Sequence, residues 1–405
     1  MTERKKPFPA LYVQNFRLFW IAQVISLSGS WMHQMAQGWL IYQLTRSPLY
    51  LGIAGAALTL PVLMFTLFGG IIADRYSKRN ILIVTQTLSI FPPLILGTLT
   101  YTGTINVWHA ILTAFLMGTI NAFDIPARQS FLIEMVGKGH LLNAIALSSA
   151  AFNGARILGP LIAGLIISWA GLPACFYINA LSFIPVVFVL KMMAIKGTAR
   201  TGSSKGFFSE FKEGIHFILK QQDILTLILT IMVFSLFGIP FSQFFPVFAE
   251  DILGVGAKGL GYMMSSAGAG AFTAAMVIAF RGKIRNTRRY MSIAALIFPA
   301  ALVAFSLSRS YPLSIIILVT MGWAAVSFLA TANSSIQENV RDGLRGRVMS
   351  VYSLVFLGMA PIGSAVIGYT ADKIGTPQAL TAAGTICLIA GSVFFLRTRR
   401  GRIDY

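Results

Sequence analysis

The chain has 405 residues, of which 56% are apolar and 11% carry a charge, with 32 Lys and Arg against 13 Asp and Glu. Because a soluble domain carries roughly 25% charged residues, this composition excludes a chain with a water-facing surface of its own, and it is equally unlike a disordered chain or a disulfide scaffold. The net charge of +19 is spread between long apolar runs, so the sequence predicts an integral membrane protein without a nucleic-acid partner.

Twelve apolar runs are long enough to cross a membrane, because a helix needs about 20 residues to span the ~30 Å hydrocarbon core. The predicted spans cover residues 16–43, 48–73, 80–101, 107–129, 141–169, 172–194, 222–248, 258–280, 290–308, 312–336, 348–370 and 376–396. The first run is too long for a cleaved signal peptide, and no small-residue cleavage site follows it.

Lys and Arg are distributed unevenly between the two ends of these spans. Of the 32, 27 lie in terminal or connecting segments on one side, four lie on the other side, and Arg156 lies inside a span. Positively charged segments stay in the cytoplasm. We therefore expect a multi-pass protein of the cell inner membrane with both termini in the cytoplasm.

A polar segment at residues 195–221 divides the spans into six and six. It predicts an N-terminal bundle at 1–194 and a C-terminal bundle at 222–405. Residues 196–205 have the composition of a flexible linker. Residues 207–219 place their apolar side chains on one helical face, which leaves two interpretations open: an interfacial amphipathic helix, or a cytoplasmic extension of span seven.

The two halves resemble each other at a constant offset of 204 residues. The shift pairs Glu134 with Glu338, Val136 with Val340, Gly159 with Gly363, Gly164 with Gly368, Gly171 with Gly375 and Pro173 with Pro377. Repeated halves joined by a central loop predict an all-α membrane fold of two pseudo-symmetric six-helix bundles, which face each other across a substrate path.

Polar side chains recur at helical spacing inside several predicted spans, where they mark either hydrogen-bonded helix packing or a water-filled cavity. For the stripe in span one we favour a cavity, whereas packing remains open for single residues elsewhere. The predicted cavity residues are Gln23, Ser26, Ser30, His33 and Gln37 in span one, with Asn121, Asn153 and Ser334 in three other spans. His33 is either a proton carrier or a hydrogen-bonded histidine that does not titrate.

Residue patterns of catalysis and of metal binding are missing from the sequence. No cluster has metal-ligand spacing, and no Ser-His-Asp set, nucleophile elbow or P-loop is present. We therefore expect neither an enzyme nor an ATP-driven pump, and no metal or cofactor.

The segment between spans two and three reads Gly70-Ile-Ile-Ala-Asp74-Arg75-Tyr-Ser-Lys78-Arg79. It resembles the signature cytoplasmic loop of the major facilitator superfamily, although Ser77 stands where that family usually has glycine. In span five, Arg156-Ile-Leu-Gly159-Pro160-Leu-Ile-Ala-Gly164 is similar to the antiporter motif of exporters. The segments 123–129 and 344–350 resemble the subgroup that contains the bacterial enterobactin exporter and related efflux proteins.

The resemblance implies roles for these residues. In the family, the aspartate at position 74 is thought to latch the two halves in one state of the transport cycle. The resemblance also implies a charge network of Asp74, Arg75, Arg79 and Asp124, with Lys78 and Arg128 in the same motif segments. The network is either a gate that responds to protonation or a static surface ion pair. Gly159 and Pro160 either pack and bend span five or take part in proton coupling.

Arg156 is the basic residue inside a span. Since an unpaired cation is costly there, it should face the bundle interior and meet an acceptor. Asp124 lies roughly 15 Å too near the inner surface for direct contact, at 1.5 Å per residue. Backbone carbonyls, Asn153 or the substrate remain as acceptors.

The leading hypothesis for function is a secondary active exporter of a small amphipathic molecule, siderophore-like or drug-like, driven by proton antiport. We expect a monomer whose partners are the substrate, protons and the lipid bilayer. An importer or a lipid or lysolipid flippase on the same scaffold is the second hypothesis. A membrane partner protein that transports nothing is the third.

Overall fold

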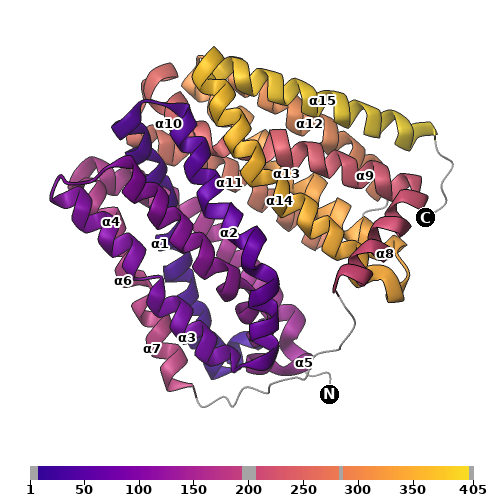
Figure 1. Cartoon of the computed structure of the whole chain (residues 1–405), viewed down its shortest axis with the longest axis horizontal. Coiled ribbons are helices and arrows are strands. Elements are labelled where there is room, and N and C mark those ends of the chain that lie inside the picture. The colour runs from indigo at the N-terminus through magenta and orange to yellow at the C-terminus, as the bar shows by residue number, and fades with distance from the viewer. Residues whose placement is uncertain (1–7, 194–206, 282–285, 401–405) are drawn as a thin grey trace, which may run out of the picture. The chain divides into compact units, whose positions relative to one another are not determined.

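The computed structural model describes residues 8–193, 207–281 and 286–400, and every regular element within these ranges is a helix (Figure 1). The first half contains η1 (Pro9–Tyr12), α1 (Gln14–Thr45), α2 (Pro48–Arg75), α3 (Lys78–Leu88), α4 (Phe91–Tyr101), α5 (Val107–Ala170), α6 (Leu172–Ser182) and α7 (Ile184–Met192). The second half contains α8 (Phe207–Lys220), α9 (Gln222–Val233), η2 (Phe234–Gly238), η3 (Ile239–Phe244), α10 (Phe245–Val247), η4 (Phe248–Ile252), α11 (Gly256–Arg281), α12 (Thr287–Leu307), α13 (Tyr311–Asn339), α14 (Asp342–Ile374) and α15 (Thr376–Arg400).

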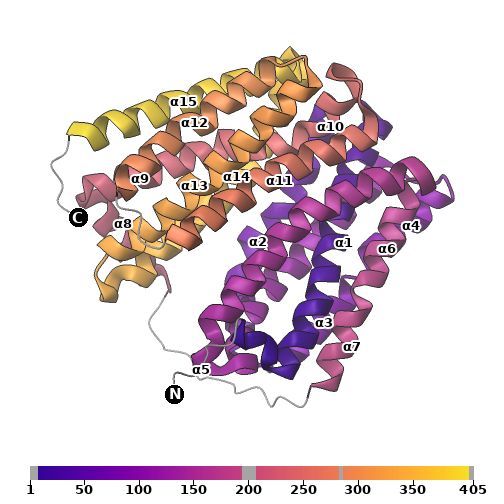
Figure 2. The same ribbon diagram turned by 180° about the vertical axis from the view of Figure 1, so that it is seen from behind.

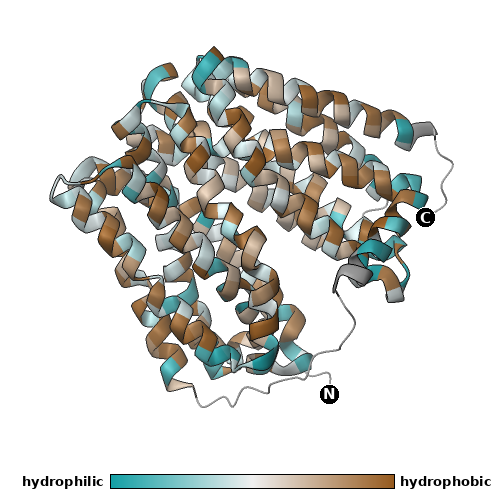
Figure 3. Cartoon of the chain, viewed as in Figure 1, coloured by the Kyte–Doolittle hydropathy of each residue, from teal (hydrophilic) through white to brown (hydrophobic). Residues whose placement is uncertain are grey.

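The helices are long enough and apolar enough for a membrane protein. Ten helical segments of the described chain pass this test by length and composition, and apolar residues run along most of the ribbon (Figure 3). Large apolar side chains are exposed on the helices, among them Phe68 at 59% and Trp169 at 91%. A surface of this kind is stable in lipid and not in water.

The count of ten segments corresponds to twelve spans. α5 has 64 residues, which is ~96 Å of helix and far more than a bilayer needs. It breaks at Gly137, where φ is 70° and ψ is 173°, a conformation essentially restricted to glycine. α5 therefore supplies two spans, and α1, with 32 residues, supplies one more. The prediction of an all-α fold with twelve spans is confirmed.

The chain divides into two compact units. Unit 1 contains residues 1–40 and 60–203, and unit 2 contains residues 41–59 and 204–405. The end of α1 and the first part of α2 thus pack with the second half of the sequence rather than with the first. The domain boundaries predicted at residues 194 and 222 stay a prediction, and the linker predicted at 196–205 lies outside the described residues.

Within unit 1 the helices pack in pairs, and where α2 crosses α5 a glycine lets two backbones approach. α3 lies beside α7, and α4 lies beside α6, as both views show (Figures 1 and 2). α2 meets α5 at Gly69, where an added Cβ would lie 2.2 Å from the carbonyl oxygen of Ala122. Phe16, Phe19 and Phe131 are buried in the core that these helices enclose.

Unit 2 has a comparable core, rich in phenylalanine. α11 packs along α13, and α12 packs along both α13 and α15. Phe234 contacts Phe298 and Phe328 with ring centroids 5.4 and 4.9 Å apart, and Phe305 contacts Phe248 at 4.5 Å. Such close ring pairs favour one packing arrangement over alternatives.

Span seven is one continuous helical segment from Gln222 to Ile252, as predicted, but its hydrogen-bond pattern changes several times along its length. α9 is followed by a π-helical turn, a 3₁₀ turn, a three-residue α-turn and a second π-helical turn, which together reach Ile252. Pro240 and Pro246 lie in this stretch, and each removes a backbone N–H donor from the helix. Irregular turns of this kind often mark a functional hinge.

The internal repeat is visible in the packing of each unit. Gly171 and Gly375 end α5 and α14 with φ values of 79° and 91°, and Leu172 and Thr376 begin the next helices. An added Cβ at Gly159 would lie 3.1 Å from the backbone nitrogen of Met32. At Gly363 it would lie 3.0 Å from the Cα of Leu236, and both residue pairs obey the offset of 204.

α8 is a helix distinct from span seven, because Gln221 between α8 and α9 has extended backbone angles. α8 packs on α14, where Gly214 lies against the backbone of Arg347 and Glu213 forms an ion pair with that arginine at 2.6 Å. Of its apolar side chains, Ile218 is buried, whereas Leu219 is 59% exposed. The interfacial position of this helix stays a prediction.

Candidate functional site

The loop between α2 and α3 contains the signature segment predicted from sequence. Asp74 and Arg75 are exposed and make no hydrogen bond or ion pair to any residue that the structure describes. Ser77 has a φ of −60°, which any residue adopts, so the loop does not need the glycine that the family usually has there. Gly70 borders open space, and the neighbouring Gly69 is the residue that packs on α5.

The two basic residues that begin α3 bind to neighbouring helices of unit 1. Lys78 forms an ion pair with Glu134 of α5 at 2.7 Å, and both side chains are about nine-tenths buried. Arg79 donates hydrogen bonds of 2.7 and 2.8 Å to the carbonyl oxygens of Leu190 and Lys191. Because the last carbonyls of α7 lack helical partners, Arg79 caps that helix.

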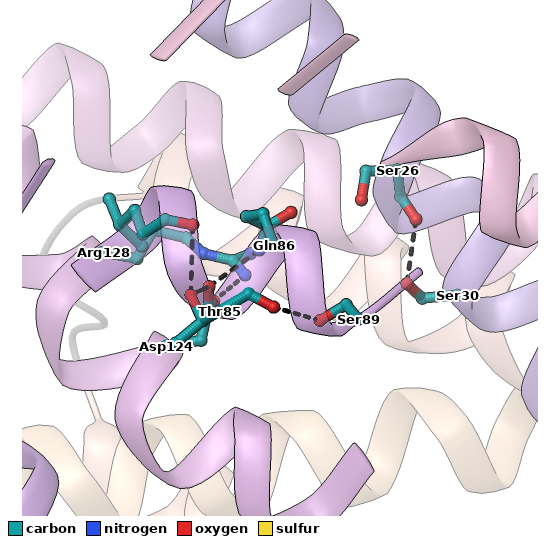
Figure 4. Close-up of polar contacts among 8 residues, drawn as sticks. Ser26, Ser30, Thr85, Gln86, Ser89, Asp124 and Arg128 are labelled. Carbon is teal, nitrogen blue, oxygen red and sulfur yellow. Dashed lines mark hydrogen bonds and ion pairs between the residues drawn. The ribbon is translucent and has the colours of Figure 1, made fainter. Parts of the chain in front are cut away.

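Asp124 is the centre of a buried polar cluster between α3 and α5 (Figure 4). The side chain of Asp124 is 1% exposed and forms an ion pair with Arg128, one turn later on α5. Its carboxylate also accepts hydrogen bonds from the Thr85 hydroxyl at 2.8 Å and the Gln86 amide at 2.7 Å. Three donors around one carboxylate compensate its charge within an apolar helix pair.

The predicted charge network of Asp74, Arg75, Arg79 and Asp124 is therefore wrong in its partners. Asp124 binds Arg128, Thr85 and Gln86, and Arg79 binds backbone carbonyls. The reason is distance along α3, because Thr85 lies six residues, or about 9 Å, beyond Arg79. The latch role of Asp74 stays a prediction.

The polar stripe of α1 lies on a largely buried face. Gln23, Ser26, His33 and Gln37 are each less than a tenth exposed, and the Ser30 hydroxyl donates to the Ser26 carbonyl at 2.9 Å. The Gln37 amide donates to the Ala110 carbonyl of α5 at 2.8 Å. His33 packs edge-on against Phe176 of α6, with ring centroids 5.2 Å apart. These contacts lie within unit 1, and the cavity-lining role of the stripe stays a prediction.

The other predicted cavity residues differ in their surroundings. Asn121 is half-buried, and Ser334 is exposed on α13. Asn153 is half-buried, and its amide donates to the Ser149 carbonyl of the same helix at 2.9 Å. Among the described residues, no hydrogen bond connects these three side chains to one another.

The antiporter-like segment of α5 is the crossing point of α5 and α1. At Gly159 an added Cβ would lie 2.6 Å from the Trp31 Cβ and 2.7 Å from the Ser28 carbonyl oxygen. Pro160 and Gly164 are buried in the same stretch of helix. One turn before the crossing, the Arg156 guanidinium lies over the Trp31 ring, 5.6 Å from its centroid. The aromatic face is an acceptor that the sequence prediction did not include.

A polar cluster that the sequence did not predict lies in unit 2, where α1 ends. Arg46 forms ion pairs with Glu250 at 3.1 Å and Asp251 at 3.4 Å. The Tyr42 hydroxyl donates to Asp251, and the Ser47 hydroxyl donates to Asp372 at 2.5 Å. The contacting residues are about 200 or more positions apart in sequence, so no local pattern could have revealed the cluster.

Metal-ligating side chains do not gather in the described part of the chain. No group of three or more His, Cys, Asp or Glu in residues 8–193, 207–281 and 286–400 is placed to hold a metal ion. Cys175 and Cys387 are both buried and free.

Comparison with known proteins gives consistent results over the whole chain. The staphyloferrin A transporter of Staphylococcus aureus is 24% identical over 95% of this chain and 96% of its own length. The multidrug efflux pump Tap of Mycolicibacterium fortuitum is 24% identical over 96% of both. A crystal structure of a bacterial homologue of the human lysosomal transporter Spinster has a TM-score of 0.73 at 15% identity, covering 97% of this chain and 98% of that one.

The family model for transmembrane secretion effectors matches residues 5–404. Together with the twelve spans, the internal repeat and the shared fold, this match identifies a membrane transporter rather than an enzyme. The chain belongs to the transmembrane secretion effector family of the major facilitator superfamily.

Proposed function

We propose that this protein is a proton-coupled exporter of a small amphipathic molecule, which acts as a monomer in the cell inner membrane with both termini in the cytoplasm. The observation that carries the proposal is similarity over more than nine-tenths of the chain to a siderophore transporter and to a multidrug efflux pump. The excess of Lys and Arg on one side of the spans supports the orientation.

Asp124 is our candidate for the group that couples transport to protons. It is a carboxylate, 1% exposed, that the helix pair surrounds with one cation and two neutral donors. Adding a proton would remove the charge that Arg128 compensates and so weaken that ion pair. The protonation state of Asp124 would then favour one of two packings of α3 against α5, which is how a local charge change biases a conformational equilibrium.

The experiment is transport by the purified full-length protein in proteoliposomes. Fluorescent drugs and ferric siderophores are loaded inside, and efflux is followed with equal pH on both sides and with an acidic exterior. We expect the acidic exterior to accelerate efflux and a protonophore to cancel the acceleration. Net movement into vesicles would support import instead, and a fluorescent lysolipid in the same vesicles tests the flippase alternative.

A pair of variants tests the role of Asp124 in this assay. Asp124→Asn keeps the shape of the side chain but carries no titratable proton, so we expect efflux that no longer responds to the pH gradient. The control is Asp223→Asn, because Asp223 is exposed in the first turn of α9 and lies outside the cluster. An Asp124→Asn variant with undiminished acceleration by acid would refute coupling through this residue.

A further inference from the structure

Arg156 lies at membrane depth without an ordinary polar partner. It precedes Ala170, the end of α5, by 14 residues, which is roughly 21 Å and places it well inside the apolar span. In the described part of the chain its guanidinium makes no hydrogen bond or ion pair, and its contact is the Trp31 ring. Arginines in spans are costly, and they mark functional sites when they are not paired within the protein.

The internal repeat shows that helix packing does not require this arginine. The offset of 204 pairs Arg156 with Ala360 and Trp31 with Ser235. In unit 2 the equivalent helices nevertheless cross closely, since an added Cβ at Gly363 would lie 1.9 Å from the Leu236 carbonyl oxygen. The second half thus builds the same crossing without a cation or a tryptophan, so these two side chains are additions to a packing scheme that works without them.

The geometry leaves the guanidinium available to an anion. The Arg156 guanidinium carbon lies over the Trp31 ring, and the N–H donors, which lie in the plane of the guanidinium, make no hydrogen bond within the described residues. The edge that these donors form fits a carboxylate, which accepts two parallel hydrogen bonds. Trp31 also contacts Phe152 with ring centroids 5.6 Å apart, so an apolar surface adjoins the charge.

We propose that Arg156 and Trp31 form a binding site for a carboxylate of the transported molecule, whose apolar part lies against Trp31 and Phe152. This inference rests on the proposed transport function, because it assigns the site to the cargo. It specifies the substrate class as amphipathic acids. Arg156 supplies the charge and the paired donors, and Trp31 positions the guanidinium.

The test measures binding rather than transport. The full chain is placed in nanodiscs of phosphatidylcholine, and calorimetry compares two acids with their neutral counterparts: 1-naphthoate with 1-naphthamide, and citrate with triethyl citrate. We expect the wild-type protein to bind at least one acid about tenfold or more tightly than its counterpart, the ratio typical of a charge-assisted hydrogen bond. Equal binding within both pairs would overturn the proposal.

The variants assign the preference to the two residues. Arg156→Gln should abolish the acid preference, Arg156→Lys should retain part of it, and Trp31→Leu should weaken acid binding severalfold. Arg309→Gln is the control, because Arg309 is exposed and donates to the Ser306 and Ser308 carbonyls. An acid preference that persists in both Arg156→Gln and Trp31→Leu refutes the site, and Arg156→Lys and Trp31→Leu remain informative if Arg156→Gln does not fold.

A second set of nanodiscs separates a soluble acid from a lipid phosphate. Phosphatidylglycerol offers the same anionic chemistry from the bilayer. Suppose that phosphatidylglycerol eliminates naphthoate and citrate binding by the wild-type protein but does not change the binding measured for Arg156→Gln. Arg156 then binds a lipid headgroup, and the assignment of the site to the substrate is wrong. Since no gradient or transport enters the measurement, an acid preference without efflux in proteoliposomes would refute the proposed function and leave this site standing.

Discussion

Gly159→Ala tests whether the crossing of α1 and α5 depends on backbone contact. The new Cβ would lie 2.6 Å from the Trp31 Cβ, 2.7 Å from the Ser28 carbonyl oxygen and 3.1 Å from the Met32 nitrogen. Carbon atoms in contact lie about 3.5–4.0 Å apart. The two helices would have to separate by about 1 Å, because Ser28 and Met32 meet the new methyl group with backbone atoms that have no alternative rotamer.

The expected change in the free energy of unfolding is the sum of two opposing effects. Forcing a methyl group into a packed interface costs about 1–3 kcal/mol, and replacing glycine by alanine in a helix recovers about 1 kcal/mol. Gly154→Ala is the matched control on the same helix, because its Cβ would meet nothing within 4 Å. It should receive the helix-propensity gain without the steric cost, so the two variants should differ by roughly 1–3 kcal/mol in the free energy of unfolding.

The assay is thermal unfolding of both purified variants in the same detergent, followed by the loss of monodisperse protein on size-exclusion chromatography. For a unit of this size the expected difference is roughly 2–12 °C in the apparent Tm, with Gly159→Ala the lower. Gly363→Ala should behave like Gly159→Ala, since its Cβ would lie 1.9 Å from the Leu236 carbonyl oxygen. If Gly159→Ala is as stable as Gly154→Ala, the crossing tolerates side chains and the packing argument fails.

Three further predictions concern unit 1. Asp74→Asn should strongly lower transport at unchanged Tm, because Asp74 is exposed and has no described partner; transport at the wild-type rate would refute the latch. Glu134→Leu should lower the Tm because it removes the 2.7 Å ion pair that Glu134 makes with the buried Lys78, and Lys78→Met in the same chain should restore most of the Tm. If the α1 stripe lines an aqueous path, Ser30→Cys should react with a membrane-impermeant thiol reagent and be protected by substrate, and reactivity equal to that of Ile25→Cys would make the stripe a packing seam.

The sequence alone determined the class of the protein and most of its helices. Span lengths are set by the thickness of the bilayer, and apolar composition is a local property, so the predicted spans agree with the observed helices to within a few residues at most boundaries. The internal repeat was also visible in the sequence, because each half has glycine at the same positions. Helix crossings require it at Gly159 and Gly363, and positive φ values require it at Gly171 and Gly375.

The sequence placed Asp124 and Arg128 in the same motif segment, four residues apart on one helical face, but did not pair them as the structure does. It assigned the wrong partners to Arg79, because helical periodicity specifies which face a side chain occupies but not which helix packs against that face. Span seven is a single helical segment, as predicted, but the irregular turns inside it were not predicted, for a related reason. Pro240 and Pro246 were visible in the sequence, but the irregular turns around them depend on neighbours that satisfy the freed backbone groups.

The tertiary structure alone decided the contacts between distant segments. Arg46 meets Glu250 and Asp251 across about 200 residues, and Arg156 meets the face of Trp31 across 125. Hydropathy and spacing show that burying the charge of Arg156 in a membrane span is energetically unfavourable. The sequence does not show which apolar neighbour places an aromatic ring against that charge. Local chemistry therefore specified where a functional group had to be, and only the packing of α1 on α5 specified what it touches.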